Sequence, residues 1–383
     1  MKVGIVGIGH GRFGRRSDAN VQELAFEPFR DALADAGGLS RKDIDALIIG
    51  SSPEYHKQRS LPGVVAEYLG MNPQATWLTE AACASGSSAI RTAYMAIKSG
   101  MHDIVVVIGL QKMTELSTPE ILALMGRVGD VQWESIFGTT FPGYYALYAT
   151  RHMYEFKTTK EQMAMVAVKN HHYGTMNPKA LFQKEVTIER CLSSDEVAYP
   201  LNVFDCCANA DGAACIIMTN EKMAKKLNDT PIWFEGMGCA SAQMSVLRRP
   251  HLVGIPSTVE ASKQAYKQAN IKPQDVQVAD VHDCFTIAEI MAYEDLGFCE
   301  KGQGGKFIEE KQSYIDGKTP VNVDGGLKAK GHPVGATGVS MTTEIVKQLR
   351  GEAGKRQVNA EVGLTHNVGG IGQYCFVHIL RRP

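Results

Sequence analysis

The sequence predicts a layered α/β protein. Residues 1–111 alternate strand-like and helix-like patterns, and residues 231–383 show a comparable mix. Alternation of this kind is typical of helices that cover a sheet. A segment of roughly 120 residues separates the two regions, too long for a simple connection inside a compact domain. We therefore expect three parts, at 1–111, 112–230 and 231–383.

The N-terminal region contains the clearer alternation. We expect strands at 2–8, 45–50, 75–79 and 103–110. We expect helices near 21–36, 60–69 and 84–99.

The C-terminal region shows a similar mix of strands and helices, but its residues show no clear sequence similarity to the N-terminal region. We expect strands near 232–239, 276–282, 361–366 and 374–381. We expect helices near 258–269, 285–296 and 337–350. The similarity between the two regions is therefore architectural.

The central segment has two recognisable stretches. Residues Phe137 to Tyr145 form a turn-like run rich in aromatic residues and glycine, and a helix with several methionines and alanines is expected at about 160–170. The segment is either an excursion that covers the core or a lid that binds substrate. These two interpretations are compatible, and the sequence leaves both open.

Composition describes an ordinary globular chain. Apolar residues make up 44% and charged residues 21% of 383 residues, and the formal net charge of -1 gives no support for nucleic-acid binding. No apolar run reaches the roughly 20 residues that span a bilayer. The N-terminus reads as a first strand and lacks a signal-peptide cleavage site.

The cysteines favour a reducing compartment. Nine are scattered along the chain, and an odd number argues against a disulfide framework. Cys206 and Cys207 are adjacent and have no CxxC spacing, so we expect no zinc site. The predicted location is the cytoplasm.

One motif imitates a dinucleotide site. Gly9-His10-Gly11-Arg12-Phe13-Gly14 matches GxGxxG after a strand. A dinucleotide fold needs a helix that opens at the last glycine. The polar run from Arg15 to Asn20 has no apolar helical stripe, so we expect no nucleotide site here.

Cys83 is the most informative single residue. It follows the strand-like run 75–79 and precedes the small residues 84–88, which open a helical pattern. A cysteine at such a turn lies at the positive end of a helix dipole, where unpaired backbone N–H groups favour a thiolate. Free cysteine is also among the most buried residue types, so a structural thiol is the alternative.

Three C-terminal segments resemble active-site loops. Val281-His282-Asp283-Cys284-Phe285 joins a strand to a helix, Gly325 to Gly338 contains His332 among many glycines, and His366 to Gly372 is a glycine-rich turn between strands. Each alone has a structural explanation, because satisfied histidines, buried cysteines and glycine turns are common. Together with Cys83 they offer a nucleophile, a base, a second thiol and backbone donors, which suits acyl transfer through a thioester.

With these motifs the chain resembles a thiolase over essentially its whole length, and Gly331-His332-Pro333 is the most specific match. The resemblance implies a thiolase fold of two similar α/β halves, layered α/β/α/β/α, with an inserted loop domain at 112–230. Two departures stand out. Common degradative thiolases carry Asn-Glu-Ala-Phe where this chain has His282 to Phe285, and Cys-x-Gly where it has Asn367-Val368-Gly369. The second thiol has thus moved to Cys284, as in archaeal acetoacetyl-CoA and sterol-carrier-protein-associated thiolases.

The resemblance also implies roles for individual residues. His332 would take the proton of Cys83, whose thiolate would attack an acyl-CoA thioester. Backbone N–H groups of Cys83 and Gly369 would hold the oxyanion. Cys284 would move a proton at the α-carbon, and His282 with His332 would stabilise the enolate oxygen. Coenzyme A thioesters are then substrates, and no bound cofactor or metal is expected.

Several alternatives stay open at this point. The acceptor is acetyl-CoA, a non-CoA acceptor, or an aryl or branched 3-oxoacyl-CoA, and an inactive scaffold subunit is the alternative from another class. The resemblance implies a homodimer or homotetramer. It also implies a zinc-containing OB-fold protein and a hydroxymethylglutaryl-CoA synthase as candidate partners, and it implies no nucleic acid or membrane.

Overall fold

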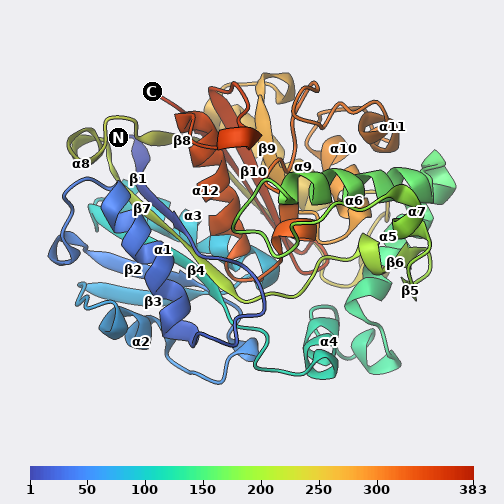
Figure 1. Ribbon diagram of the computed structural model, residues 1–383, viewed down its shortest axis with the longest axis horizontal. Helices are drawn as coiled ribbons and strands as arrows, with labels where there is room; N and C mark the ends of the chain where they lie inside the picture. Colours follow the sequence, from blue (N-terminus) through green and yellow to red (C-terminus); the bar gives the residue numbers. More distant parts are fainter.

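The computed structural model describes residues 1–383, and one mixed sheet runs through the whole molecule (Figure 1). Its strands are β1 Val3–His10, β2 Ala46–Gly50, β3 Ala75–Thr79, β4 Ile104–Gln111, β7 Gly212–Asn220, β8 Ile232–Ser241, β9 Val278–Val281, β10 Val362–Gly369 and β11 Tyr374–Arg381. The strand order is β3-β2-β4-β7-β1-β8-β11-β10-β9. Strands β1 and β8 pair only through Gly4–Trp233 and Ile5–Ile232, so this short junction joins an N-terminal to a C-terminal half.

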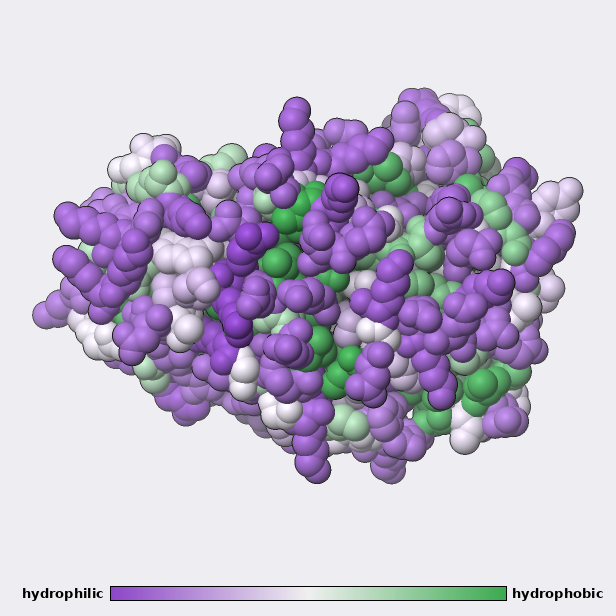
Figure 2. Space-filling view, turned by 90° about the horizontal axis from the view of Figure 1, so that it is seen from above, coloured by the Kyte–Doolittle hydropathy of each residue, from purple (hydrophilic) through white to green (hydrophobic).

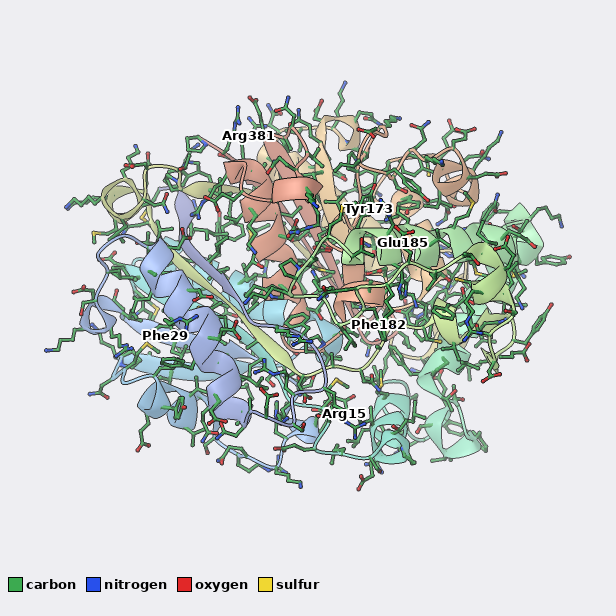
Figure 3. The ribbon with its side chains drawn as sticks, viewed as in Figure 1. Arg15, Phe29, Tyr173, Phe182, Glu185 and Arg381 are labelled. Carbon is green, nitrogen blue, oxygen red and sulfur yellow. The ribbon has the colours of Figure 1, made fainter.

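Outer helices cover each half of the sheet. Helix α1 (Val21–Asp35) packs on β1 and β7, and α2 (Leu61–Tyr68) packs beside α1 and β3. In the other half, α9 (Pro256–Ala269) packs on β8 and β11, and α10 (Thr286–Asp295) contacts α9. In Figure 3, Phe29 projects from α1, and its fully buried ring belongs to the core beneath this helix.

A central layer lies between the halves. It consists of α3 (Ser85–Lys98) and α12 (Thr337–Arg350), which contact each other and strands of the sheet (Figure 1). α3 packs on β4 and β2, whereas α12 reaches β7 on one side and β10 on the other. Separate apolar cores fill the space outside the N-terminal sheet, around the central helices and against the C-terminal sheet. The expected α/β/α/β/α layering is confirmed.

Residues 112–230 contain most of the remaining helices. These are α4 (Thr118–Gly126), α5 (Phe141–Phe156), α6 (Lys160–Gly174), α7 (Ile188–Leu192) and α8 (Glu221–Leu227), with the short strands β5 (Glu196–Ala198) and β6 (Leu201–Asn202). α5, α6 and α7 lie together at one end of the molecule (Figure 1). Strand β7 also falls in this interval, yet it pairs with β4 and β1 inside the N-terminal sheet. The C-terminal region adds α11 (Gly304–Glu309).

The aromatic-rich stretch from Phe137 to Tyr145 differs from the expected turn, because α5 begins within it. Thr140 caps the helix by accepting a hydrogen bond from the Gly143 backbone N–H, and Pro142 lies in the first turn. Proline is well tolerated there because the first N–H groups of a helix have no partner inside it. The prolines and glycines that suggest a turn are thus a helix start, and α5 presents Phe141 and Tyr145 as buried residues.

The GxGxxG motif has a packing role. No helix opens at Gly14, since α1 begins only at Val21. A Cβ on Gly9 would lie 1.9 Å from the Pro28 carbonyl oxygen, so this glycine lets α1 approach β1. The expectation that the motif is not a dinucleotide site agrees with this arrangement.

The surface drawn in Figure 2 is mostly hydrophilic, and hydrophobic residues show there as separate patches. None of the helices combines the length and the apolar character that crossing a membrane requires.

Candidate active site

Cys83 lies in a tight turn between β3 and α3. A short 3-10 helix spans Ala82–Ala84, and Ala82 adopts a φ of 50°, a conformation that is uncommon for a residue with a side chain. The Ser85 hydroxyl holds the turn, because it accepts from the Ala81 N–H at 2.9 Å and donates to the Ala82 carbonyl at 2.6 Å. The turn directs the thiol inward, and Cys83 is 4% exposed.

The starts of the two central helices meet beside this turn. A Cβ on Gly86 would lie 2.9 Å from the Gly335 carbonyl oxygen, and one on Gly338 would lie 2.2 Å from the Ser87 hydroxyl. Only residues without side chains allow this approach. The loop that carries His332 therefore reaches Cys83, and both helix N-termini direct positive dipole ends at the site.

Cys83, His282 and His332 form a compact buried group. The sulfur and one nitrogen from each ring lie within 4.8 Å of one another, and the ring centroids of the histidines are 5.2 Å apart in an edge-to-face arrangement. Each histidine uses Nδ1 in a hydrogen bond to a fourth side chain, Thr337 for His332 and Asn367 for His282, and Nε2 of each has no partner. Two ring nitrogens are thus free to act beside one thiol.

Burial keeps all three groups neutral in the resting protein. It raises the pKa of the Cys83 thiol to about 12, although the Gly370 backbone N–H opposes this shift. It lowers the pKa of His332 to about 3 and that of His282 well below the usual value, the latter also through His332. The sequence predicted that helix-end donors favour the thiolate, but desolvation outweighs them here.

Cys284 lies near this group but outside the closest cluster. It is fully buried at the start of α10, and its carbonyl accepts from the Cys207 N–H at 2.9 Å. Burial raises the pKa of the Cys284 thiol well above its usual value, and the thiols of Cys207 and Cys83 add to this effect. The Tyr145 hydroxyl on α5 donates to the Gly370 carbonyl at 3.3 Å. It also lies near the Cys284 sulfur and partly offsets the rise in the pKa of this thiol. Cys284 is therefore held as a thiol.

Backbone donors come from the glycine turn after β10. The Gly370 N–H and the Cys83 N–H both lower the pKa of the Cys83 thiol. The expected donor Gly369 is the adjacent residue, and a Cβ on it would lie 2.2 Å from the Ala81 carbonyl oxygen. The glycine turn and the Cys83 turn therefore pack directly together.

Asp283 fixes the segment between the two site residues His282 and Cys284. Its carboxylate accepts from the backbone N–H groups of Leu327 and Lys328 at 2.7 and 3.2 Å, and from the Asn170 side chain at 2.7 Å. Burial, together with Glu289, raises the pKa of Asp283 to about 7. Asp283 thus ties the His282–Cys284 segment to the His332 loop and to α6.

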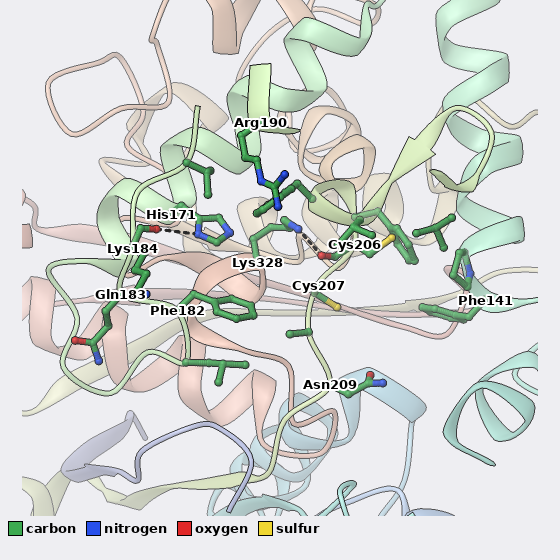
Figure 4. A pocket seen from close by; sticks show the side chains of 18 of the residues that line it. Phe141, His171, Phe182, Gln183, Lys184, Arg190, Cys206, Cys207, Asn209 and Lys328 are labelled. Atoms are coloured by element: carbon green, nitrogen blue, oxygen red, sulfur yellow. Dashed lines mark hydrogen bonds between the residues drawn. The ribbon is translucent and has the colours of Figure 1, made fainter. Parts of the chain in front are cut away.

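Figure 4 shows a cavity of about 800 Å³, whose lining includes Phe285, the residue that follows Cys284. Most of its lining side chains are apolar, and all but Phe285 and Lys328 come from residues 112–230. Lys184, Arg190 and Lys328 give it cationic groups. The labels in Figure 3 place Phe182 and Glu185, two further lining residues, in the segment that follows α6.

Hydrogen bonds link the cavity wall to the segments that carry the site residues. The Lys328 ammonium donates to the Cys206 carbonyl, and the His171 ring contacts the Lys184 carbonyl at 3.1 Å (Figure 4). Residues 206–209 run along the cavity, and the His332 N–H donates to the Ala208 carbonyl at 3.0 Å. Cys207 and Asn209, which line the cavity, also contact the site segments, since the Cys207 N–H donates to the Cys284 carbonyl and Asn209 forms an isolated β-bridge with His332.

The donor set of the compact group also matches what soft metals prefer, since zinc binds thiolate and imidazole. Zinc ligands lie about 2.0–2.3 Å from the ion. A bound zinc ion would therefore require the Cys83 sulfur and the two ring nitrogens to lie closer together than 4.8 Å. The expectation of no metal remains a prediction.

The sequence predicts Cys83, His282, Cys284 and His332 as site residues, and the fold brings all four close together. The sequence does not assign Thr337, Asn367 or Tyr145. The Thr337 hydroxyl bonds the His332 ring at 2.7 Å, and the Asn367 amide bonds the His282 ring at 3.1 Å. Asn367 lies in a segment that the sequence singled out, but its partner is 85 residues away.

Comparison with known proteins finds matches over both halves of the chain. A family model described as "Thiolase, N-terminal domain" matches residues 3–222, and one described as "Thiolase C-terminal domain-like" matches residues 238–382. Among solved structures, the Ltp2-ChsH2(DUF35) aldolase superposes with a TM-score of 0.86 at 25% identity. The match covers 99% of this chain and 97% of that one.

Three relatives are similar over nearly the whole chain. An acetyl-CoA acetyltransferase of Methanothermobacter thermautotrophicus is 43% identical over 99% of both chains. The benzoylsuccinyl-CoA thiolase subunit BbsB of Thauera aromatica is 35% identical over 96% of this chain and 95% of its own. Bovine sterol carrier protein 2 is 31% identical over 96% of this chain and 70% of its own. With family models over both halves and relatives of this identity, the chain belongs to the thiolase family.

Proposed function

We propose that the chain is an acetyl-CoA C-acyltransferase that makes or cleaves 3-oxoacyl-CoA through an acyl group on Cys83, with acetoacetyl-CoA made from acetyl-CoA as the principal reaction. The observation that carries this proposal is the buried group of one thiol and two unpartnered imidazole nitrogens within 4.8 Å. The names of the most similar relatives, such as the acetyl-CoA acetyltransferase of Methanothermobacter, support the acetyl assignment.

In the cleavage direction, His332 takes the proton of Cys83 as the sulfur attacks the 3-carbonyl carbon. Backbone N–H groups of Cys83 and of the Gly369–Gly370 turn hold the resulting oxyanion. Donors preorganised in this way typically contribute about 2.7–4 kcal/mol each. The thiol is neutral at rest, so proton transfer accompanies the attack.

The carbon–carbon bond then breaks, and the Cys284 thiol gives its proton to carbon 2. His282 donates a hydrogen bond to the enolate oxygen during this step. A proton donor must be protonated beforehand, which suits the raised pKa of Cys284. Coenzyme A returns a proton to Cys284 and attacks the Cys83 thioester, and His332 returns its proton to Cys83. Condensation is the reverse sequence.

The cavity beside the site is the proposed site for coenzyme A. Its volume of about 800 Å³ lies in the range of ligand pockets, and its apolar wall suits the long pantetheine arm. Lys184, Arg190 and Lys328 suit the phosphates, because cationic side chains bind phosphate through charge-assisted hydrogen bonds. This supports the proposal that residues 112–230 act as the inserted domain that binds CoA and sets acyl specificity.

An aryl 3-oxoacyl-CoA is the second candidate substrate, favoured by the similarity to the benzoylsuccinyl-CoA thiolase subunit. The aromatic side chains of α5 oppose it, since Tyr145 stacks on Phe285 with a centroid distance of 4.5 Å and fills the space beside Cys284. An inactive scaffold is disfavoured because it has no need for unpartnered imidazole nitrogens beside a thiol.

A second protein as partner belongs to the same proposal, and a structural neighbour whose name includes a DUF35 component beside its thiolase-like chain supports it. The candidates are those that the family resemblance implies: an OB-fold zinc protein, a hydroxymethylglutaryl-CoA synthase, and further copies of this chain in a homodimer or homotetramer. All nine cysteines are free, which suits a reducing cytoplasm.

The test is a panel of acyl-CoA substrates. Purified protein is given acetyl-CoA alone, acetoacetyl-CoA with CoA, and benzoyl-substituted 3-oxoacyl-CoA with CoA, and product CoA esters are quantified. We expect turnover of the first two, abolished in Cys83→Ala. Turnover of only the aryl substrate would replace the acetyl assignment, and no turnover of any ester would overturn the proposed function.

A further inference from the structure

Each of the two histidines beside Cys83 has Nδ1 in a hydrogen bond and Nε2 without a partner. We propose that Asn367 is the positioning residue that fixes His282 as the Nε2–H tautomer, which makes His282 a donor while His332 remains an acceptor. This inference rests on the proposed function for its catalytic meaning but on the resting structure for its geometry.

The orientation of the Asn367 amide follows from its neighbours. The nitrogen of the amide lies 3.2 Å from the Cys83 carbonyl oxygen, and its oxygen accepts from the Ser87 hydroxyl at 2.9 Å. A backbone carbonyl only accepts hydrogen bonds, so the NH2 group must face it. The opposite orientation would place two acceptor oxygens together, with both groups fully shielded from water.

This orientation determines the tautomer of His282. The same Asn367 nitrogen lies 3.1 Å from Nδ1 of His282. An amide nitrogen only donates, so Nδ1 carries the lone pair. The neutral ring then carries its proton on Nε2, the atom without a partner that remains for the site. His282 therefore presents an N–H donor.

His332 is fixed in the opposite way by the same logic. The Thr337 hydroxyl donates to the Pro333 carbonyl at 3.2 Å, which only accepts. The Thr337 oxygen therefore accepts from Nδ1 of His332 at 2.7 Å. The unpartnered Nε2 of His332 carries a lone pair and can take a proton.

The result is a division of roles between two chemically identical side chains. His332 accepts the Cys83 proton, and His282 donates to an oxygen that gains negative charge. If Nε2 of both histidines were an acceptor, the oxygen that gains negative charge would face a lone pair. If Nε2 of both were a donor, Cys83 would have no base. By the register of the resemblance, Asn367 stands where common degradative thiolases carry their second cysteine, so one position has exchanged a proton-transferring thiol for a positioning amide.

The direct test is the tautomer itself. In protein labelled with ¹⁵N-histidine, two-bond ¹⁵N–¹H correlations distinguish the tautomers, and His282→Gln and His332→Gln spectra assign the two rings. We expect the Nε2–H pattern for His282 and the Nδ1–H pattern for His332 in the unliganded wild-type protein. The same tautomer on both rings would overturn the proposal, and this measurement needs no substrate.

Asn367 variants test the cause. Asn367→Asp places an acceptor against Nδ1, so His282 should change to the Nδ1–H or doubly protonated form. Cleavage of acetoacetyl-CoA should lose about 10²–10³ in kcat with little change in KM, because a charge-stabilising donor is lost. Asn367→Ala should leave His282 a mixture of tautomers.

The matched control is Ser87→Ala, which removes only the contact to the amide oxygen and leaves the Cys83 carbonyl to orient the NH2 group. It should keep the His282 tautomer and stay within a few fold of wild-type kcat. An unchanged His282 tautomer in both Asn367 variants would overturn the positioning role. If the wild-type protein has the predicted tautomers but does not cleave acetoacetyl-CoA, the proposed function is overturned and the positioning role of Asn367 stands.

Discussion

At the residue scale, the site is a neutral thiol next to two neutral imidazoles. Desolvation dominates its electrostatics, since Cys83, His282 and His332 are all buried. The backbone donors and helix N-termini around Cys83 act most strongly when charge develops during reaction, and they do not suffice to ionise the resting thiol.

This state predicts how Cys83 reacts with iodoacetamide. The thiolate is the nucleophile, and with a pKa near 12 its fraction rises about tenfold per pH unit. The rate of Cys83 alkylation, followed by peptide mass spectrometry, should therefore climb without a plateau from pH 7 to pH 9. A rate already constant from pH 6 upward would show a resting thiolate–imidazolium pair and contradict this description.

The role of Cys284 predicts a separation of two half-reactions. Cys284→Ala should keep acylation of Cys83 by acetyl-CoA and slow carbon–carbon cleavage by about 10²–10⁴, the usual contribution of a general acid or base. Cys239→Ala, which removes a half-buried thiol on β8, is the control and should leave both steps unchanged. If Cys284→Ala cleaves substrate at the wild-type rate, Cys284 is not the proton donor, and His282 becomes the candidate for that role.

The sequence predicts the four side chains that the fold brings to the site, but not those that orient them. Cys83 and His332 stand out because small residues and glycines surround them. Thr337 looks like any first-turn threonine, and Asn367 acts through contacts with residues more than 80 positions away. Such contacts exist only once the central helices have packed.

At the element scale, helix–helix contact decides the geometry. The expected strands and helices of both halves agree with the structure to within a few residues, because their patterns are long and regular. The sequence predicts no strand at β7. This strand lies inside the interval 112–230, and only the fold shows that it pairs between β4 and β1. The sequence predicts a turn at the start of α5, because proline and glycine, here Pro142 and Gly143, occur in turns as well as in first helical turns.

The contact between α3 and α12 predicts the effect of Gly338→Ala. Its Cβ would lie 2.2 Å from the Ser87 hydroxyl and 2.6 Å from the Asn367 amide oxygen, so the helices must move apart. We expect a loss of about 1–3 kcal/mol in the free energy of unfolding in urea, as overpacking usually causes. Activity should fall as well, because Cys83 and His332 separate.

Gly63→Ala is the matched control for that experiment. Gly63 lies in α2 with no heavy atom within 4 Å of an added Cβ, and alanine favours a helix by about 1 kcal/mol. This variant should be as stable as the parent or more so. Equal stability of Gly338→Ala and Gly63→Ala would show that the contact between α3 and α12 accommodates an added methyl group, which would contradict this prediction.

At the scale of the whole molecule, two sheet halves supply the reacting groups and residues 112–230 supply the cavity. Phe285 and Lys328 are the lining residues that the halves contribute. Under the proposed function, the halves perform the chemistry and the cavity binds coenzyme A. Substitutions in the cavity should therefore affect substrate binding more than reaction.

Arg190→Glu tests this separation. Losing a cation and adding an acid at the cavity should raise KM for acetyl-CoA about tenfold or more, since a charged hydrogen bond contributes about 1.5–3 kcal/mol. The kcat should change little. Arg151→Glu on the exposed side of α5 is the control. A fall in kcat at unchanged KM would place CoA outside this cavity.

The central claim is that Cys83 carries the acyl group. The protein is mixed with acetyl-CoA at a chosen pH, quenched in acid within seconds, digested, and its peptides are analysed by mass spectrometry. We expect an acetyl thioester on the peptide that contains Cys83, absent in Cys83→Ala and still present in Cys284→Ala. An acetyl group found only on Cys284, Cys207 or another residue would contradict it.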